Sequence, residues 1–223
     1  MLDDASHRTS FAELTLGAFV ERLASADPVP GGGSASAVAA SLGAALVAMV
    51  ASLSQGRPKY AEHAALHDRA IDVGQRLSRR FLELADEDAA AYARFSAAAK
   101  LPKDTDQERS DRAIAVAAAA RTASEVPLAT VEACLELVLT AEVLAGRSNV
   151  NASSDLNVAA QLGEAAARGA AENVLVNLPA VGDEEFSGEA TAQVMDWLDT
   201  IATLAAETHQ AVRSGSPRDP VAA

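Results

Sequence analysis

The 223-residue chain is poor in cysteine, aromatic and basic side chains. Its single cysteine, Cys134, excludes a disulfide bond within the chain, and we expect a cytoplasmic location. The formal net charge of −13 argues against a general role in binding nucleic acids or anionic membranes. Only 4% of the residues are aromatic while 49% are hydrophobic, so a core has to be built from Ala, Leu and Val. Because alanine has the highest helix propensity and lets helices pack closely, this composition predicts an all-α protein.

Several short functional motifs are also missing. The chain has neither the GxGxxG fingerprint of dinucleotide-binding folds nor a Gly-Lys-Ser/Thr phosphate-binding loop. It begins with the acidic residues 1–4, Met-Leu-Asp-Asp, so we expect no signal peptide. His63 and His67 share one helix face, but no HExxH sequence accompanies them, and we expect a solvated face and no metal site. Cys134 has no neighbour in the sequence that would activate its thiol.

The most informative segment is residues 28–34, Pro-Val-Pro-Gly-Gly-Gly-Ser, which leads into a run without formal charge from Gly31 to Gly56. Three glycines permit positive φ and a close approach to a ligand, and Ser34 could cap a helix whose N–H groups receive an anion. A tight turn before a buried helix is the alternative. The run is long enough to span a membrane, but its Ala, Ser and Gly content suits close packing, and we expect a buried helix of a soluble protein.

Hydrophobic periodicity and capping signals predict about seven helices and no strands. The third is expected to be one long helix that could bend at Gly74, and Thr105 and Glu108 form a capping-box pattern before the fourth. Pro127 either kinks the fourth helix or starts a fifth. The expected helices cover about residues 16–25, 34–53, 58–99, 106–124, 127–146, 155–178 and 188–213. Because no Pro/Gly-rich linker divides the chain, residues 1–223 are predicted to form a single-domain bundle, with a core at about 15–213 and frayed ends.

Acidic residues within apolar stretches are candidates for chemistry. Asp86 and Asp88 interrupt the long helix on nearly opposite faces, so at most one faces the core, where a carboxylate can gain a raised pKa. The alternative is a solvated acidic face. Asp155 follows two serines at a helix start, where it either complements the helix dipole or contacts a substrate with the support of Asn149 and Asn151.

Two amides and two cations complete the set of candidates. Asn173 and Asn177 lie one turn apart in an apolar segment, and buried amides need hydrogen-bond partners. They either bond neighbouring helices or bind the amide-like edge of a heterocycle. Arg57 and Lys103 stand at helix ends or in loops, where a cation can meet a substrate carboxylate. Scattered surface charges are the alternative for both.

Taken in order, these segments resemble the cyclodeaminase/methenyltetrahydrofolate cyclohydrolase domain of the formiminotransferase-cyclodeaminase family. Each motif alone is weak, but the ordered set is specific and covers roughly Leu16 to Phe186. The matching residues are Pro30-Gly31-Gly32-Gly33-Ser34 with the Ala-rich segment and Gly56-Arg57, Asp86 and Asp88, Leu101-Pro102-Lys103 with Thr105, Val126-Pro127-Leu128, Asn149, Ser154-Asp155-Leu156 with Val158-Ala159-Ala160, and Asn173-Val174 with Asn177-Leu178.

The resemblance implies an all-helical domain that dimerises through helix packing. It binds a tetrahydrofolate derivative in a cleft between helices near the subunit interface and needs no metal or redox cofactor. In 5,10-methenyltetrahydrofolate one carbon bridges two nitrogens as an electrophilic amidinium. Hydrolysis needs a base to activate water and an acid to protonate the departing pterin-side nitrogen. In cyclodeamination the other nitrogen attacks a formimino carbon, and ammonia leaves protonated.

On this resemblance we expect Asp155 and Asp88 to transfer protons, with Lys103 as an electrostatic or proton-donating partner. The expected substrate-binding residues are the glycine turn, the amides that orient the pterin with a neighbouring serine, and a cation for the glutamate tail. They are Gly31, Gly32, Gly33, Ser34, Asn149, Ser154, Asn173, Asn177 and Arg57.

The choice between the two activities of the family stays open in the sequence. The chain lacks the formiminotransferase domain of bifunctional members, which favours methenyltetrahydrofolate cyclohydrolase. Formimidoyltetrahydrofolate cyclodeaminase is the alternative. The alternative from another class is a non-catalytic helical scaffold or folate-binding subunit, for which substitution of the aspartates would leave every property except thermal stability intact.

Overall fold

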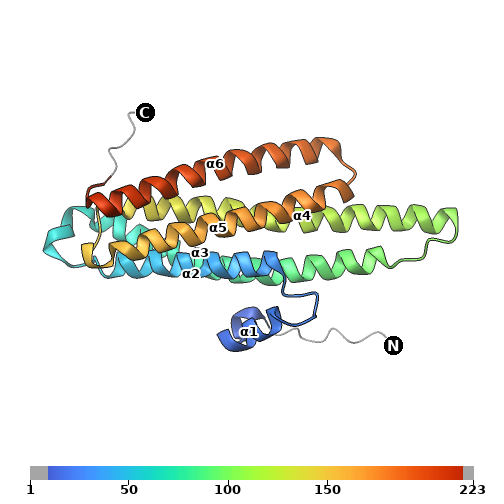
Figure 1. Cartoon of the computed structure of the whole chain (residues 1–223), viewed down its shortest axis with the longest axis horizontal. Coiled ribbons are helices and arrows are strands. Elements are labelled where there is room, and N and C mark those ends of the chain that lie inside the picture. The colour runs from blue at the N-terminus through green and yellow to red at the C-terminus, as the bar shows by residue number, and fades with distance from the viewer. Residues whose placement is uncertain (1–9, 218–223) are drawn as a thin grey trace.

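α-Helices make up most of residues 10–217, the part of the chain that the computed structural model describes (Figure 1). No strand occurs in that part, so the all-α prediction is confirmed. The acidic first residues and the end of the tail, for which we expect frayed ends, fall outside the described residues. The helices are α1 (Leu16–Leu23), α2 (Gly32–Ser52), α3 (Ala64–Ala99), α4 (Asp106–Leu144), α5 (Ser153–Asn177) and α6 (Glu184–Ser214), with 3-10 turns at Phe11–Glu13, Pro58–His63, Val150–Ala152 and Leu178–Ala180.

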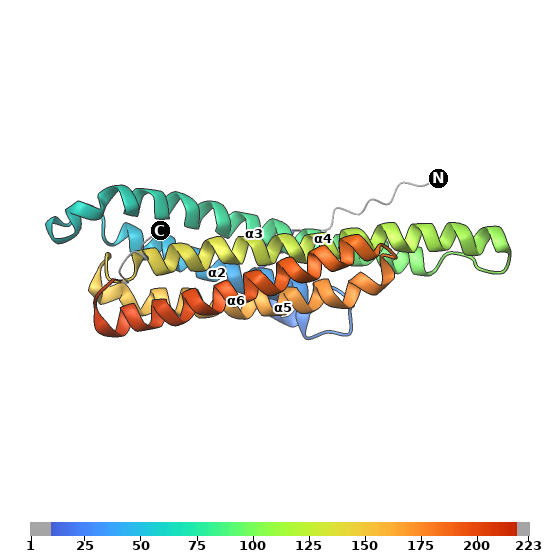
Figure 2. The ribbon, with the colours of Figure 1, turned by 90° about the horizontal axis from the view of Figure 1, so that it is seen from above.

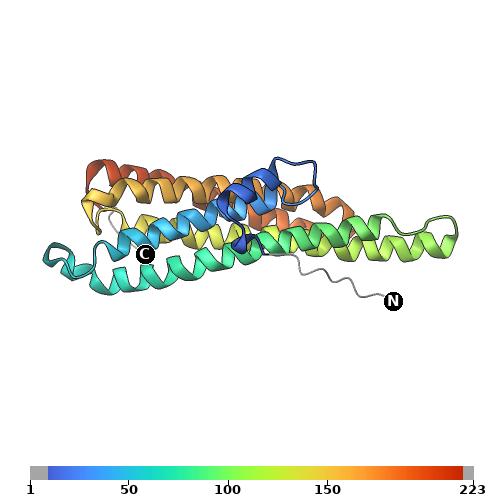
Figure 3. The same ribbon diagram turned by 90° about the horizontal axis from the view of Figure 1, so that it is seen from below.

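The long helices α2 to α6 run lengthwise in one bundle (Figure 1). α2 and α4 each contact both α3 and α5, which makes a four-helix core, and α6 packs on α4 and α5. The end of α3 and the start of α4 extend together beyond the other helices (Figure 2). α1 lies outside the bundle (Figure 1), next to the segment that leads into α2 (Figure 3). The end of the bundle that carries the turn between α3 and α4 is therefore built from a different part of the sequence than the opposite end.

Helix α2 is the one helix in the described part of the chain that is long and apolar enough to span a bilayer. Its residues Ala37, Ala40, Ala44 and Val47 are at most 1% exposed, and the helix contacts both α3 and α5. Small side chains on several faces suit this position, because α2 packs against α3 on one side and α5 on another, while Leu42 and Met49 stay exposed. The packing agrees with the expectation of a buried helix.

Gly74 is a contact point between helices and not a break. α3 runs through it as one helix of 36 residues, which confirms the prediction of a long helix. A Cβ at Gly74 would lie 2.7 Å from the carbonyl oxygen of Ala44 and 2.9 Å from the Cβ of Ala48. Both neighbours belong to α2, so the absence of a side chain lets α2 and α3 approach closely.

Pro127 lies inside α4, so it does not start a new helix, and the six α-helices of the described residues are close to the predicted number of about seven. Proline has no N–H to donate to the carbonyl group four residues earlier, which here is that of Ala123. The side-chain Nδ2 of Asn177 donates to this carbonyl oxygen at 2.8 Å. A side chain at the end of α5 thus supplies the hydrogen bond that α4 cannot make, and α4 continues through the proline.

Asn177→Leu is expected to lower the free energy of unfolding by about 1–3 kcal/mol, because the Ala123 carbonyl loses its donor. In a Pro127→Ala background, the N–H of residue 127 restores the helical hydrogen bond, and the same substitution should cost much less. Urea denaturation of the wild type, both single variants and the double variant measures the coupling free energy. Equal losses in the two backgrounds would contradict this account of Asn177.

Candidate functional site

A cavity of about 280 Å³ collects the glycine turn and several of the predicted polar residues. It lies where the start of α2 meets α3 and the end of α5, and we call it the Asp88 cavity. It is lined by Pro28, Val29, Gly31, Gly32, Gly33, Asp88, Ala91, Tyr92, Phe95, Ala123, Asn173, Val176 and Asn177. None of these lining residues is basic. The cavity is therefore apolar and aromatic with one carboxylate and two amides.

Asp88 is the half-buried carboxylate of this cavity. The buried hydroxyl of Ser34 donates to Asp88 Oδ2 at 2.8 Å and lies 3.1 Å from the carbonyl oxygen of Ala85. Burial raises the pKa of Asp88 because it disfavours the charged form, and the hydrogen bonds from Ser34 lower it by a smaller amount. A carboxyl group with a raised pKa takes up a proton more readily than an ordinary aspartate and can return it, as a general acid–base group must.

The backbone conformation of the glycine turn, residues 31–33, differs from our expectation. Gly31 is the N-cap of α2 in an extended conformation, and none of the three glycines has a positive φ. Ser34 does not cap the helix but lies in its first turn and bonds to α3. The expectations of positive φ and of a Ser34 cap are therefore wrong, because the turn is shaped by its contact with α3.

Gly33 is required by the approach of the Asp88 carboxylate. A Cβ at Gly33 would lie 2.3 Å from Asp88 Oδ1 and 2.7 Å from the Asp88 carboxyl carbon. Any side chain at this position would force the carboxylate to turn away. Gly33 and Ser34 lie on α2, and together they fix the position of the Asp88 carboxylate on the facing helix α3.

The neighbours of Asp88 in the sequence have ordinary structural partners. Asp86 accepts hydrogen bonds from the hydroxyl of Ser10 and the backbone N–H of Phe11, which hold the 3-10 turn before α1 against α3. Glu87 pairs with Arg80 at 2.6 Å. Of the three consecutive acidic residues 86–88, only Asp88 therefore contributes a carboxylate to the cavity, as the helical spacing predicts.

Asn173 and Asn177 both line the cavity, one turn apart on α5. The Nδ2 atom of Asn173 donates to the carbonyl oxygen of Gly169 at 2.8 Å, within its own helix. Asn177 makes the bond to α4 described above, so its interhelical role is confirmed. Each amide keeps an oxygen and a second N–H that these contacts do not use.

Tyr92 and Phe95 also line the cavity and were not among the predicted site residues. They stand four and seven residues after Asp88, so all three side chains lie on one stripe of α3. This spacing was the signal in the sequence that could have revealed them. It has no meaning, however, until it is known which face of the helix borders the cavity.

Asp155 and Ser154 lie far from the Asp88 cavity in this chain. They belong to the first turn of α5, whereas Asn173 is near its other end, and the stretch between Asp155 and Asn173 is about 27 Å long at about 1.5 Å per residue. A single chain therefore does not bring Asp155 and Asp88 together, because α5 is one uninterrupted helix. That the two aspartates serve one site stays a prediction that needs a second copy of the chain.

Asn149 and Arg57 are at the same end of the bundle as Asp155. Asn149 is buried, its backbone N–H donates to Ser54 Oγ at 2.8 Å, and its Nδ2 donates to the carbonyl oxygen of Leu53 at 3.3 Å. These bonds join the loop before α5 to the end of α2. Arg57 is exposed just before the 3-10 turn at Pro58. Neither residue lines the Asp88 cavity.

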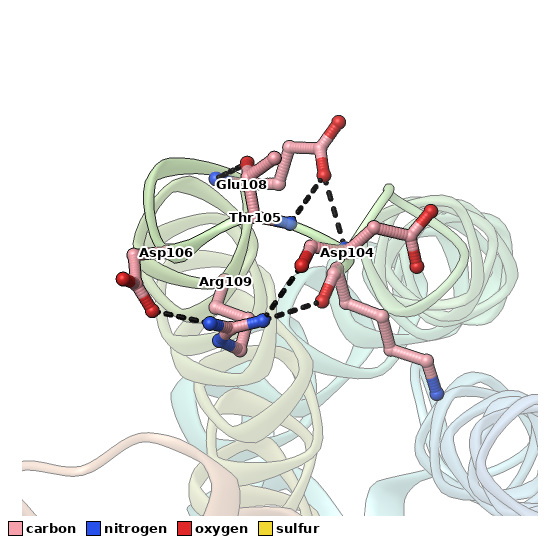
Figure 4. A network of polar contacts seen from close by, with 6 residues as sticks. Asp104, Thr105, Asp106, Glu108 and Arg109 are labelled. Atoms are coloured by element: carbon pink, nitrogen blue, oxygen red, sulfur yellow. Dashed lines mark hydrogen bonds and ion pairs between the residues drawn. The ribbon is translucent and has the colours of Figure 1, made fainter.

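Lys103 lies exposed on the turn between α3 and α4. The turn is held by the predicted capping box, in which Thr105 Oγ1 accepts from the N–H of Glu108 at 3.2 Å and Glu108 Oε2 accepts from the N–H of Thr105 at 2.9 Å (Figure 4). Arg109 adds a bond to the carbonyl oxygen of Lys103 at 3.2 Å. The main chain of this turn is fixed, but Lys103 does not line the Asp88 cavity.

The histidines and the cysteine have structural surroundings. His67 is 1% exposed, and its Nε2 lies 2.9 Å from the carbonyl oxygen of Arg147, so the expectation of a solvated face is wrong for this residue. Cys134 is buried, and burial raises the pKa of its thiol, which disfavours the nucleophilic thiolate. Between residues 10 and 217, no group of three or more His, Cys, Asp or Glu side chains could hold a metal ion.

Comparisons with known proteins cover most of the chain. The family model described as formiminotransferase-cyclodeaminase matches residues 15–196. A methenyltetrahydrofolate cyclohydrolase of Methylorubrum extorquens is 36% identical over 200 residues, which are 90% of this chain and 96% of the relative. A formimidoyltransferase-cyclodeaminase of Gallus gallus is 36% identical over 184 residues, 82% of this chain but 34% of the relative. The chain thus spans about a third of the bifunctional protein.

A solved structure shows the same fold. The crystal structure of a formiminotetrahydrofolate cyclodeaminase from Thermotoga maritima superposes with a TM-score of 0.82 at 24% sequence identity, covering 91% of this chain and 98% of the other. The glycine turn, the Asp88 stripe and the paired asparagines all lie within the segment that the family model matches. The chain therefore belongs to the formiminotransferase-cyclodeaminase family.

Proposed function

We propose that this protein is a methenyltetrahydrofolate cyclohydrolase in which Asp88 transfers the protons. The observation that carries the proposal is a half-buried carboxyl group, held by Ser34, in a cavity lined by aromatic rings and amides. The cyclohydrolase of similar length supports the choice of reaction. The reaction as proposed takes only the folate derivative and water.

The chemistry places definite demands on the acid. Water adds to the methenyl carbon, and the Asp88 carboxylate takes one proton from it. The resulting tetrahedral carbon then loses its bond to the pterin-side nitrogen, which receives a proton from the Asp88 carboxyl group. The remaining hydroxyl proton leaves to solvent, and the carbon becomes a formyl group on the other nitrogen. One carboxyl group whose pKa is raised by burial can serve both steps.

Ser34→Ala is expected to move the acid limb of the kcat/KM pH profile to higher pH. The active form of free Asp88 is the carboxylate, so the rate rises with pH through its pKa. Burial already raises this pKa, and the Ser34 hydrogen bonds oppose the increase. Removing the hydroxyl removes part of that opposition, so the pKa increases further.

Ser41→Ala is the matched control, because Ser41 is a buried serine of α2 whose hydroxyl donates to the carbonyl oxygen of Ser78 at 2.9 Å. It should leave the limb in place. A limb that stays fixed in Ser34→Ala, or moves to lower pH, would show that Ser34 does not set the protonation of the essential group.

Formimidoyltetrahydrofolate cyclodeamination is the second candidate, because this chain also aligns with one part of the bifunctional formimidoyltransferase-cyclodeaminases. The same carboxyl group could assist the attack of the second nitrogen on the formimino carbon and the departure of ammonia. Loss of the methenyl chromophore in buffer measures the first activity, and ammonia release from the formimino compound measures the second. A purified protein with neither activity would overturn both proposals and leave the non-catalytic alternative.

We further propose that the protein acts as a homodimer. Ile114, in the first part of α4, is 67% exposed, and Val176, which lines the Asp88 cavity, is 72% exposed. Apolar side chains at such positions favour association with another chain. A second copy also offers a way for Asp155 to contribute to the cavity without a rearrangement of the bundle.

A further inference from the structure

The Asp88 cavity combines one carboxylate with two aromatic side chains. The chain has only two tyrosines and five phenylalanines, yet Tyr92 and Phe95 both border this cavity. They follow Asp88 along one stripe of α3, so their rings and the carboxylate form one wall. Tyr92 is 46% exposed, which leaves part of its ring open to a ligand.

Such a wall is suited to a flat cation. The face of an aromatic ring carries negative charge density and attracts cations, and a neighbouring carboxylate adds to this attraction. No basic side chain among the lining residues competes for these groups. A neutral heterocycle would gain the packing against the rings but not the charge interaction.

The opposite wall of the cavity suits the edge of a heterocycle. Asn173 and Asn177 each use one N–H on a backbone carbonyl oxygen, both at 2.8 Å, which fixes how the amides are turned. Each amide keeps one acceptor and one donor for a ligand. These match the alternating donors and acceptors at the edge of a pyrimidinone ring.

We propose that Tyr92 and Phe95 recognise the positive charge of the methenyl substrate, whose ring system packs against their faces while its edge meets the two amides. This inference rests on the proposed cyclohydrolase function. Hydrolysis converts the cationic amidinium into a neutral formyl amide. The aromatic wall therefore holds the substrate more tightly than the product and favours product release.

Tyr92→Leu and Phe95→Leu test this proposal, because leucine keeps apolar volume but has no ring face. Each variant is expected to raise KM for 5,10-methenyltetrahydrofolate about tenfold with little change in kcat. The inhibition constant of 5-formyltetrahydrofolate, whose one-carbon group is uncharged, should rise less than about threefold, because the contact of its rings with the aromatic wall depends on packing alone. The control Met195→Ala, at an exposed position of α6, should leave all constants unchanged.

The outcomes separate this inference from the proposed function. Unchanged KM values in both leucine variants would overturn the aromatic wall while the enzyme stays a cyclohydrolase. Equal increases for the cationic and the neutral compound would overturn the recognition of charge. A wild-type protein without turnover of the methenyl compound would overturn the proposed function itself. Circular dichroism melting curves confirm that each variant is folded before its constants are compared.

Discussion

Asp88→Asn is expected to lower kcat for the methenyl compound by about 100- to 10,000-fold, the range that a general acid–base group contributes. Asparagine has nearly the same shape and still accepts the hydrogen bond from the Ser34 hydroxyl, so the cavity should keep its form. It cannot, however, take a proton from water or return one to the departing nitrogen. Rates of chromophore loss at saturating substrate measure the effect.

Stability distinguishes this loss from unfolding. Because burial raises the pKa of Asp88 in the folded state, the native protein binds more protons than the unfolded chain between the ordinary aspartate pKa and the raised one. The free energy of unfolding contributed by Asp88 therefore falls as pH rises through that window. Asp88→Asn lacks this dependence, so it should be at least as stable as the wild type at neutral pH. Urea denaturation at several pH values measures the difference.

Asp86→Asn is the matched control, two residues away on the same helix. Asp86 holds Ser10 and Phe11 and does not line the cavity, so its replacement should cost stability and spare turnover. If Asp88→Asn instead kept more than a tenth of the wild-type kcat, Asp88 would not be the proton-transferring group.

Asp155→Asn is expected to cause a second large loss of turnover, which a partner chain can repair. Asp155 and Asp88 are held near opposite ends of α5, so they can share a site only across two copies of the chain. In a symmetric dimer, a heterodimer of Asp88→Asn and Asp155→Asn chains has one intact site. Coexpression of the two variants should then restore about a quarter of the wild-type activity, because about half of the dimers are mixed.

Separately tagged chains allow the mixed dimers to be isolated and assayed. Mixed dimers without activity would show that Asp155 does not act in the Asp88 cavity of the partner. Full activity of Asp155→Asn alone would show that this residue only complements the dipole of α5, the interpretation that its place in the first helical turn also allows.

Local signals in the sequence predicted most of the helices. The Thr15 side chain accepts from the N–H of Ala18 at the start of α1, and the Thr105–Glu108 capping box opens α4 as predicted. These signals act over three or four residues, so the sequence contains all that they need. Pro127 was ambiguous because its effect depends on a donor from elsewhere. Only the packed bundle brings Asn177 to the Ala123 carbonyl.

The amino-acid sequence by itself determined the helical class, the long buried helices and the acids and amides available for chemistry, because composition, periodicity and capping are local properties. The tertiary structure decided which of them meet. Asp88 lines the cavity, whereas Asp86 and Glu87 have other partners. Gly33 leaves room for the Asp88 carboxylate, and Tyr92 and Phe95 line the same cavity. Asp155 lies at the far end of α5. These outcomes depend on how rigid helices pack against one another, which no short stretch of sequence specifies.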